Sequence, residues 1–210
     1  MKKSDIIEVM EIFKKENPEP KSDLKYTNPY TLLTAVLLSA QTTDIGVNKA
    51  TRELFKIADT PQKMLDLGED RLKDYIKTIG LYNNKAKNVI KMSKILVDQH
   101  NGEIPQSRTA LEALPGVGRK TANVVLNIAF EMNTIAVDTH VFRVANRLKL
   151  VESDKLLDVE LGLEKKIPIN YLYHAHHWLI LHGRYICKAR TPLCKDCKIA
   201  EYCKSKDKNI

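Results

Sequence analysis

Four cysteines are concentrated near the end of the chain. The first 186 residues contain none, and then Cys187, Cys194, Cys197 and Cys203 follow with the spacing C-x6-C-x2-C-x5-C. Thiolates grouped in this way are typical of a metal site, and four of them suit either zinc or a 4Fe-4S cluster. Disulfides are disfavoured, because no secretion signal is found and the cytosol keeps thiols reduced. A zinc ribbon usually has two C-x2-C pairs rather than one, but the residues alone leave both metals open.

A second group of residues is suited to binding phosphate. In the stretch ALPGVGRKTANVV, residues 113–125, Pro115 ends one helix and a second begins at Arg119. Gly116 and Gly118 permit backbone angles that other residues avoid, so the chain can turn sharply between the two helices. The turn exposes unpaired N–H groups at the positive end of the second helix, where a phosphate can approach. We therefore predict a helix-hairpin-helix unit that holds a DNA backbone without reading its sequence, with an ordinary helix corner as the alternative.

Lys120 and Asp138 carry the side chains that are best suited to catalysis. A neutral lysine amine can attack carbon and form a Schiff base, and a helix N-terminus beside Arg119 favours the neutral form. A carboxylate such as that of Asp138 can accept a proton or stabilise positive charge. Taken alone, however, a lysine at a hairpin is by default a phosphate contact, and Asp138 is by default the cap of a helix that begins at Thr139.

Helical periodicity runs through most of the chain, and we find no convincing strand. Residues such as Ser4, Thr43 and Thr60 are expected N-caps. The expected helices are one between Ser4 and Asn17, one at about 30–39, one after Thr43, one from Thr60 to Gly68, then 71–79, 84–100, 107–114, 119–130, one after Asp138, and about 154–166 and 171–183. The expected fold class is all-α, built from about ten short helices.

Two further clusters are interpreted as structural. Lysines at spacings of four and three form one face of the helix expected at 84–100, which is by default a solvated face. A group of histidines near the cysteines is expected to pack and hydrogen-bond within a helical domain rather than to form a second metal site. These lysines are Lys87, Lys91 and Lys94, and the histidines are His174, His176, His177 and His182.

Composition favours a polyanionic partner. The 210 residues carry a formal net charge of +8, and neutralising phosphates releases counterions, although charge alone gives nucleic-acid binding only about even odds. The longest apolar run, Leu32 to Ala40, is too short to span a bilayer. The N-terminal MKKSDIIEVM lacks the apolar core of a signal peptide, so we expect no membrane association and a place in the cytoplasm, close to chromosomal DNA.

The motifs LPGVGRKTANVVL and VDTHVFRV, with the 6-2-5 cysteine spacing, resemble the endonuclease III family of bacterial DNA glycosylases with abasic-site lyase activity. The resemblance extends from LLSAQTTD through IKTIGLYN to HHWLILHGRYIC, which is nearly the whole chain. It implies a two-domain all-α fold with a groove between the domains. The helix-hairpin-helix domain would span residues 22–132, with the hairpin at about 107–127, and the cluster domain residues 1–21 plus 133–210. The implied substrate is damaged double-stranded DNA, and the implied lesions are oxidised pyrimidines such as thymine glycol.

The resemblance also assigns roles to residues. It implies that Lys120 is the nucleophile, that Asp138 is the catalytic aspartate, and that the four cysteines hold a 4Fe-4S cluster. Gln41 and Leu81 would fill the hole that a flipped base leaves in the duplex. The remaining implied DNA contacts are Gly116, Gly118, Arg119 and His140. We expect the chain to act as a monomer.

Two alternatives stay open at this point. A related adenine mismatch glycosylase shares the hairpin, the aspartate and the cluster, but usually lacks the lysine and has an extra C-terminal domain. A non-catalytic DNA-binding module stapled by zinc would use Lys120 only to contact phosphate.

Overall fold

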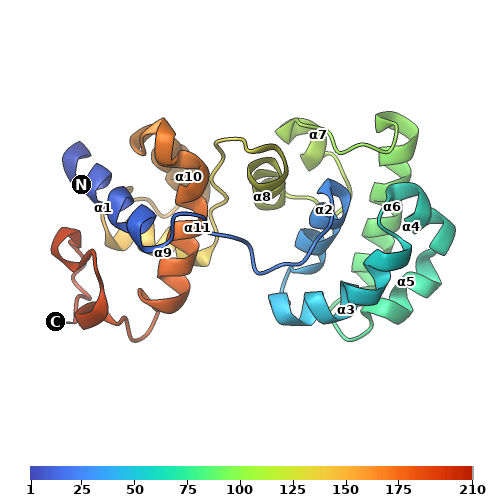
Figure 1. Ribbon diagram of the computed structural model, residues 1–210, viewed down its shortest axis with the longest axis horizontal. Coiled ribbons are helices and arrows are strands. Elements are labelled where there is room, and N and C mark those ends of the chain that lie inside the picture. Colours follow the sequence, from blue (N-terminus) through green and yellow to red (C-terminus); the bar gives the residue numbers. More distant parts are fainter. Residues whose placement is uncertain (210) are drawn as a thin grey trace. The chain divides into compact units, whose positions relative to one another are not determined.

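Every regular element that the computed structural model describes, over residues 1–209, is helical (Figure 1). The α-helices are α1 (Lys3–Glu16), α2 (Pro29–Leu38), α3 (Asp44–Ile57), α4 (Pro61–Leu67), α5 (Glu69–Ile76), α6 (Tyr82–His100), α7 (Arg108–Glu112), α8 (Arg119–Phe130), α9 (Thr139–Arg147), α10 (Leu156–Lys166) and α11 (Ile169–Tyr185). Two 3-10 helices, Cys194–Asp196 and Ala200–Tyr202, lie in the cysteine-rich segment. The all-α fold expected from the periodicity is confirmed. None of the helices in the described range has the length and apolar character that a bilayer crossing requires.

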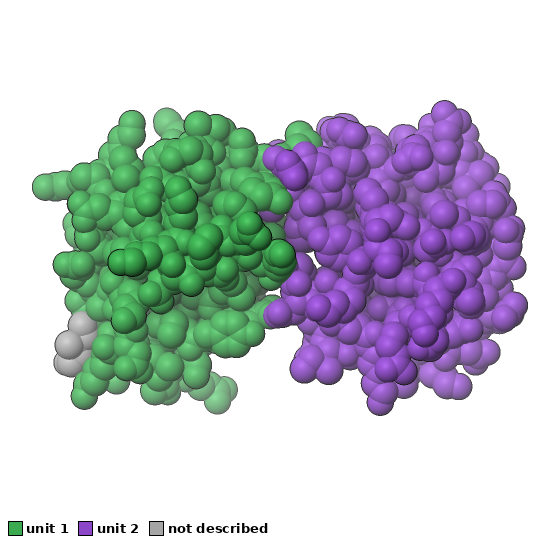
Figure 2. All heavy atoms as spheres, viewed as in Figure 1, with its two compact units in different colours: residues 1–21, 132–210 green, residues 22–131 purple. Residues whose placement is uncertain are grey.

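The chain divides into two compact units, which Figure 2 shows in different colours. Unit 1 consists of Met1–Lys21 and Met132–Ile210, and unit 2 of Ser22–Glu131. Each unit has its own hydrophobic core. The division falls after Glu131, one residue before the boundary that the resemblance implies.

Helix α2 is the central element of unit 2. Its N-cap Asn28 accepts a hydrogen bond from the N–H of Thr31 at 2.9 Å, and Pro29 starts the helix with a preset φ. Every residue from Tyr30 to Leu38 is buried, because α3, α6 and α8 all pack against this uncharged helix. Helix α6 in turn packs against α4 and α5, so the core of unit 2 is continuous.

The helices of unit 2 begin close to the expected residues, and two of them, α5 and α6, begin two residues earlier than expected. The expected caps Thr43 and Thr60 each accept a hydrogen bond from the first turn of the helix that follows, and so does Ser107, which was not expected as a cap. The helix expected at 71–79 occupies Glu69–Ile76 instead, because Gly68 turns the chain at φ 82° and lets α5 begin at once. Helix α6 begins at Tyr82 rather than at residue 84, because Leu81 adopts the left-handed conformation at its N-cap.

Unit 1 is built from α1, α9, α10 and α11, with α11 packed against both α9 and α1 (Figure 1). The apolar side chains that α1 buries in this core are Ile6, Val9, Met10 and Phe13. Ser4 is not the N-cap of α1, because the carboxylate of Asp5 accepts the N–H of Lys2, which is the N-cap, and the helix starts two residues earlier than expected. Helix α11 covers Ile169–Tyr185 and is longer than expected at both ends.

Candidate DNA-binding and catalytic site

Helices α7 and α8 and the turn between them form the predicted hairpin in unit 2. Gly116 has φ +80°, and a Cβ there would lie 2.9 Å from Nδ2 of Asn88 and 3.1 Å from Cδ1 of Leu37. Glycine is therefore required at this position by both the backbone and the close packing. Gly118 does not use the backbone freedom that glycine permits, since its φ of −99° and ψ of 176° are open to any residue. A Cβ at Gly118 would have nothing within 4 Å, so the space in front of α8 is open.

The first turn of α8 presents a positive, exposed surface. No side chain in the described part of the chain caps this helix, so the N–H groups of its first turn keep their affinity for an anion. Nη1 of Arg119 lies 3.9 Å from Oε1 of Glu112 at the end of α7, and this contact joins the two sides of the hairpin. Lys120 is the second residue of α8, and its side chain is exposed. A phosphate group and a reactive amine can thus both be accommodated within one helical turn.

Asp138 is the N-cap of α9 in unit 1, as its sequence position predicts. Its Oδ1 accepts the main-chain N–H groups of His140 and Val141, both at 2.8 Å. Among residues 1–209, its other oxygen, Oδ2, has no hydrogen-bond partner. His140 is partly buried, and its Nδ1 lies 3.2 Å from Nη2 of Arg143. The capping bonds fix the direction of the carboxylate and leave one oxygen available.

Gln41 and Leu81 lie in unit 2 and share an unusual conformation. Their φ values are 55° and 59°, which is the left-handed region that residues other than glycine rarely adopt. Gln41 lies in a turn closed by a hydrogen bond from the N–H of Thr42 to the carbonyl of Ser39, and its side chain is exposed. The side chain of Leu81 is 58% exposed, so it is not a core residue. Residues with an unfavourable backbone conformation cluster at functional sites.

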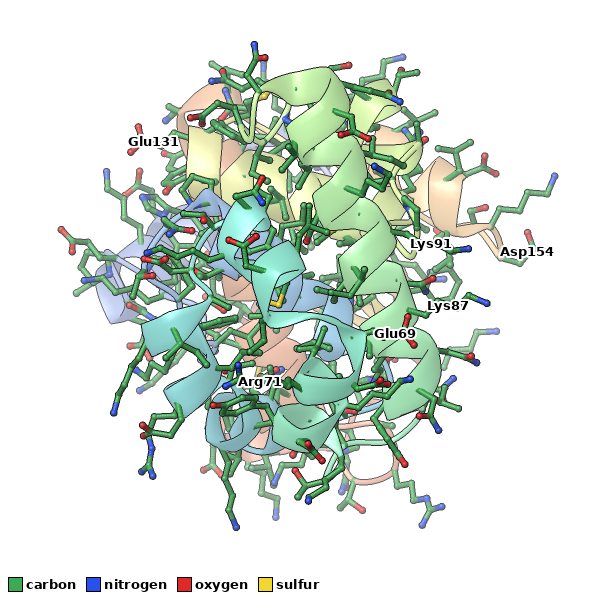
Figure 3. All side chains as sticks on the ribbon, turned by 90° about the vertical axis from the view of Figure 1, so that its right-hand side faces the viewer. Glu69, Arg71, Lys87, Lys91, Glu131 and Asp154 are labelled. Atoms are coloured by element: carbon green, nitrogen blue, oxygen red, sulfur yellow. The ribbon has the colours of Figure 1, made fainter. Side chains whose placement is uncertain are left out.

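Two lysines of the predicted lysine face extend into solvent from α6. Lys87 and Lys91 are exposed and project from the same side of the helix (Figure 3). Nζ of Lys94 instead pairs with Oδ2 of Asp98 at 3.0 Å. The face therefore has two available positive charges next to the Leu81 end of α6.

The four cysteines gather around one cavity in unit 1. Apolar side chains such as Leu148, Ile186 and Leu193 make up most of the remaining lining, together with His182 and Lys208, and no carboxylate lines the cavity. Burial raises the pKa of the Cys197 thiol, and the three neighbouring thiols act in the same direction against one main-chain hydrogen bond. Metal binding would offset this effect, because a bound metal favours the thiolate. Within residues 1–209, no set of three or more His, Cys, Asp or Glu side chains forms a recognisable site for a single metal ion.

Two arginines of α9 bind main-chain carbonyls around Cys187. The sequence did not indicate this role for them. Arg143 donates to the carbonyls of Gly183 at 2.7 Å and Cys187 at 3.0 Å. Arg147 donates to the carbonyls of Lys188 and Ala189 at 2.7 and 2.9 Å, and its Nη1 lies 3.6 Å from Sγ of Cys187. The only signal in the sequence is their spacing of four, which places both on one face of a helix. These hydrogen bonds link α9, the helix that Asp138 caps, to the start of the cysteine-rich segment.

The histidines near this segment pack within α11 and its neighbours. His182 is buried, its ring centroid lies 5.3 Å from that of Phe13, and its Nε2 lies 3.9 Å from Sγ of Cys197. The rings of His176 and His177 contact each other edge to face, with centroids 5.1 Å apart. Burial lowers the pKa of His177 to about 4, and the charge of His174 acts in the same direction.

This chain is similar to known DNA repair proteins over most of its length. Residues 34–168 match the family model of the HhH-GPD superfamily of base excision DNA repair proteins. The chain is 54% identical to endonuclease III of Escherichia coli (strain K12) over 208 residues, which cover 99% of both chains. It is 60% identical to endonuclease III of Rickettsia conorii (strain ATCC VR-613 / Malish 7) over 195 residues, or 93% of each chain.

A solved structure agrees with these relatives. The structure of a trapped covalent intermediate between endonuclease III and DNA, an estranged-adenine complex, superposes with a TM-score of 0.90 at 44% identity, covering 97% of this chain and 96% of that one. The chain therefore belongs to the endonuclease III family of the HhH-GPD superfamily. It is a base-excision repair DNA glycosylase with abasic-site lyase activity, and the adenine mismatch and zinc-module alternatives are disfavoured.

Proposed function

We propose that this enzyme removes oxidised pyrimidines such as thymine glycol from damaged double-stranded DNA through a Schiff base on Lys120. The observation that carries the proposal is the position of this amine, exposed on the first turn of an uncapped helix behind an open glycine turn. The covalent DNA intermediate of the endonuclease III relative supports a nucleophile in the family. We propose a monomer that acts on chromosomal DNA in the cytoplasm.

The proposed reaction begins with a nucleotide turned out of the base stack. The neutral amine of Lys120 attacks C1′ of its sugar, the C1′–N bond breaks, and the base leaves with the bonding electron pair and a proton. One proton of the amine goes to the departing base, and the other goes to the ring oxygen O4′ as the C1′–O4′ bond breaks, giving a Schiff base between Nζ and C1′. Loss of a proton from C2′ then breaks the bond between C3′ and its phosphate oxygen. Water finally releases Lys120 from the unsaturated sugar.

Asp138 is proposed to assist at the sugar. A carboxylate beside C1′ stabilises the positive charge that develops as the base leaves, and can accept a proton from the attacking amine. The hydrogen bonds to Oδ1 from His140 and Val141 direct the carboxylate, and Oδ2 is the oxygen available for this purpose.

The proposed DNA contacts lie on three features of the chain. Gln41 and Leu81 enter the space left by the extruded base, since the loss of base stacking around an empty space costs a few kcal/mol. Gly116, Gly118 and Arg119 bind the phosphate backbone at the hairpin, which gives affinity without sequence reading. His140 is proposed as a further, weaker contact.

The four cysteines are proposed to hold a 4Fe-4S cluster. The residues fit this group, because four thiols line one cavity whose other lining is mostly apolar, with His182 and Lys208 and with no carboxylate. A bound cluster would fix the shape of a loop rich in lysine and arginine, and thereby hold its positive charges toward DNA. Iron and acid-labile sulfide in the purified yellow-brown protein would support the assignment, whereas stoichiometric zinc in a colourless protein would overturn it.

Single-turnover cleavage of a duplex with one thymine glycol tests the proposed function. We expect release of the base together with a strand break that leaves an unsaturated sugar on the 3′ end. Leu81→Ala is expected to slow base release while leaving the iron content unchanged. A protein that binds the duplex but releases no base would contradict the proposal.

A further inference from the structure

One face of α6 contacts each of the three proposed DNA-facing elements of unit 2. Leu81 lies at the N-cap of the helix, Lys85 one turn later and Asn88 one turn after that, at spacings of four and three. Asn88 packs against Gly116 of the hairpin, where a Cβ would lie 2.9 Å from its Nδ2. Lys85 lies between these two contacts and reaches the turn that carries Gln41. Its surroundings are unusual for a lysine.

Lys85 is buried without a counter-charge. The residue is only 5% exposed, and its Nζ donates to Oγ1 of Thr42 at 2.9 Å. Within the described residues no carboxylate lies within ion-pair distance of this ammonium group, and burial lowers its pKa. A buried lysine with a single hydroxyl partner costs free energy that an apolar side chain would avoid. Packing alone therefore gives no reason for a lysine at this position.

The contacts of Lys85 join Leu81 to the turn that contains Gln41. Its main-chain N–H donates to the carbonyl of Leu81 at 3.0 Å and closes the first turn of α6. Its side chain reaches across to Thr42, the residue after Gln41. Left-handed conformations at residues other than glycine persist only where the surroundings hold them. One lysine thus touches both segments that must enter the duplex together.

We propose that Lys85 is a positioning residue that holds the Gln41 turn and Leu81 at a fixed separation for insertion into the duplex. The inference rests on the proposed function, in which these two residues replace the extruded base. When both side chains are held in place before binding, the protein loses less conformational entropy as the complex with the extruded nucleotide forms. Without Lys85 the Gln41 turn moves independently of Leu81, and fewer complexes hold the damaged nucleotide out of the stack.

Lys85→Met separates positioning from a purely structural role. Methionine keeps the length of the side chain and removes the buried charge, so the free energy of unfolding should stay the same or rise. Release of thymine glycol under single-turnover conditions should nevertheless fall about tenfold, the value of one charge-assisted hydrogen bond. Cleavage at a preformed abasic site should change less than about threefold, because a nucleotide without a base is extruded at low cost.

Matched variants complete the test. Thr42→Val removes the acceptor with little change of shape and should reproduce the selective loss, and Thr42→Val with Lys85→Met should be no worse than either alone. Leu81→Ala with Lys85→Met should likewise lose less than the product of the single effects. Lys77→Met, which changes an exposed lysine of unit 2, should behave as the unaltered protein.

The outcomes distinguish this inference from the proposed function. Normal base release by Lys85→Met beside slow release by Leu81→Ala would overturn the inference and leave the proposed function standing. Equal losses on both substrates, or a lower free energy of unfolding for Lys85→Met, would also overturn it. Normal release by Leu81→Ala would instead remove the proposed role of Leu81 itself.

Discussion

The carboxylate of Asp138 accepts the N–H of Val141 at 2.8 Å through the same oxygen that accepts the N–H of His140. Capping of α9 thus uses Oδ1 alone. Because the proposed catalytic role uses Oδ2, the structural and the chemical function of this side chain lie on different atoms. Substitutions at Asp138 can therefore separate them.

Asp138→Asn should keep the helix cap and lose the chemistry. The amide oxygen of asparagine accepts the same two N–H groups, so the free energy of unfolding should change by less than about 0.5 kcal/mol. Base release should fall at least about 100-fold, because a neutral amide neither accepts a proton nor stabilises positive charge. Asp138→Ala should lose both functions, with about 1 kcal/mol of stability removed. Excision by the asparagine variant at the normal rate would assign Asp138 to the helix cap alone.

The two hairpin glycines should respond differently to alanine. Gly116→Ala should lower the stability of unit 2 by about 1–3 kcal/mol, because φ is +80° and the added methyl meets Asn88 and Leu37. Gly118→Ala should leave stability nearly unchanged, since the methyl meets nothing within 4 Å, but should weaken DNA binding by crowding the phosphate in front of α8. Urea unfolding and binding to an abasic duplex measure the two effects. Equal stability losses would contradict the hairpin geometry.

Unit 1 should lose stability in acid through His177. Burial lowers the pKa of His177 to about 4, below its ordinary value, so the folded protein favours the neutral imidazole. The contribution of this histidine to the free energy of unfolding is therefore fully present above about pH 6.5 and is lost as the pH falls toward about 4. The glutamine of His177→Gln stays uncharged. Between about pH 7 and pH 5, the free energy of unfolding of this variant should fall by up to about 2 kcal/mol less than that of the unaltered protein. Fluorescence of Trp178, the single tryptophan, reports the unfolding of unit 1. His100→Gln in unit 2 serves as the control, and identical acid sensitivity in the His177 variant would count against this explanation.

Local signals explain why much of the fold was predictable. Caps such as Thr43, Thr60, Ser107 and Asp138 act within one turn of helix, and breakers such as Gly68 act on their own backbone. The stretch from Arg119 to Phe130 is a helix with the expected ends. Nothing local indicated that Leu81 would adopt a left-handed conformation, because that conformation is rare for a leucine.

Contacts between distant residues explain what was missed. Lysine is normally exposed, so the burial of Lys85 against a hydroxyl 43 residues away has no signature in the chain. The carbonyls that Arg143 and Arg147 bind lie about 40 residues further on, and main-chain acceptors carry no side-chain signal. Such features need the folded structure, whereas the hairpin and the cysteines were visible as motifs.

Borohydride trapping on a duplex with one abasic site tests the central claim most directly. Reduction converts a Schiff base into a stable amine, so the unaltered protein should form a covalent adduct with the DNA. Lys120→Ala should form none while still binding the duplex, and Lys77→Ala should form the normal amount. Peptide mapping should place the adduct on Lys120. An adduct that persists at the normal level in Lys120→Ala would contradict the assignment of this lysine as the nucleophile.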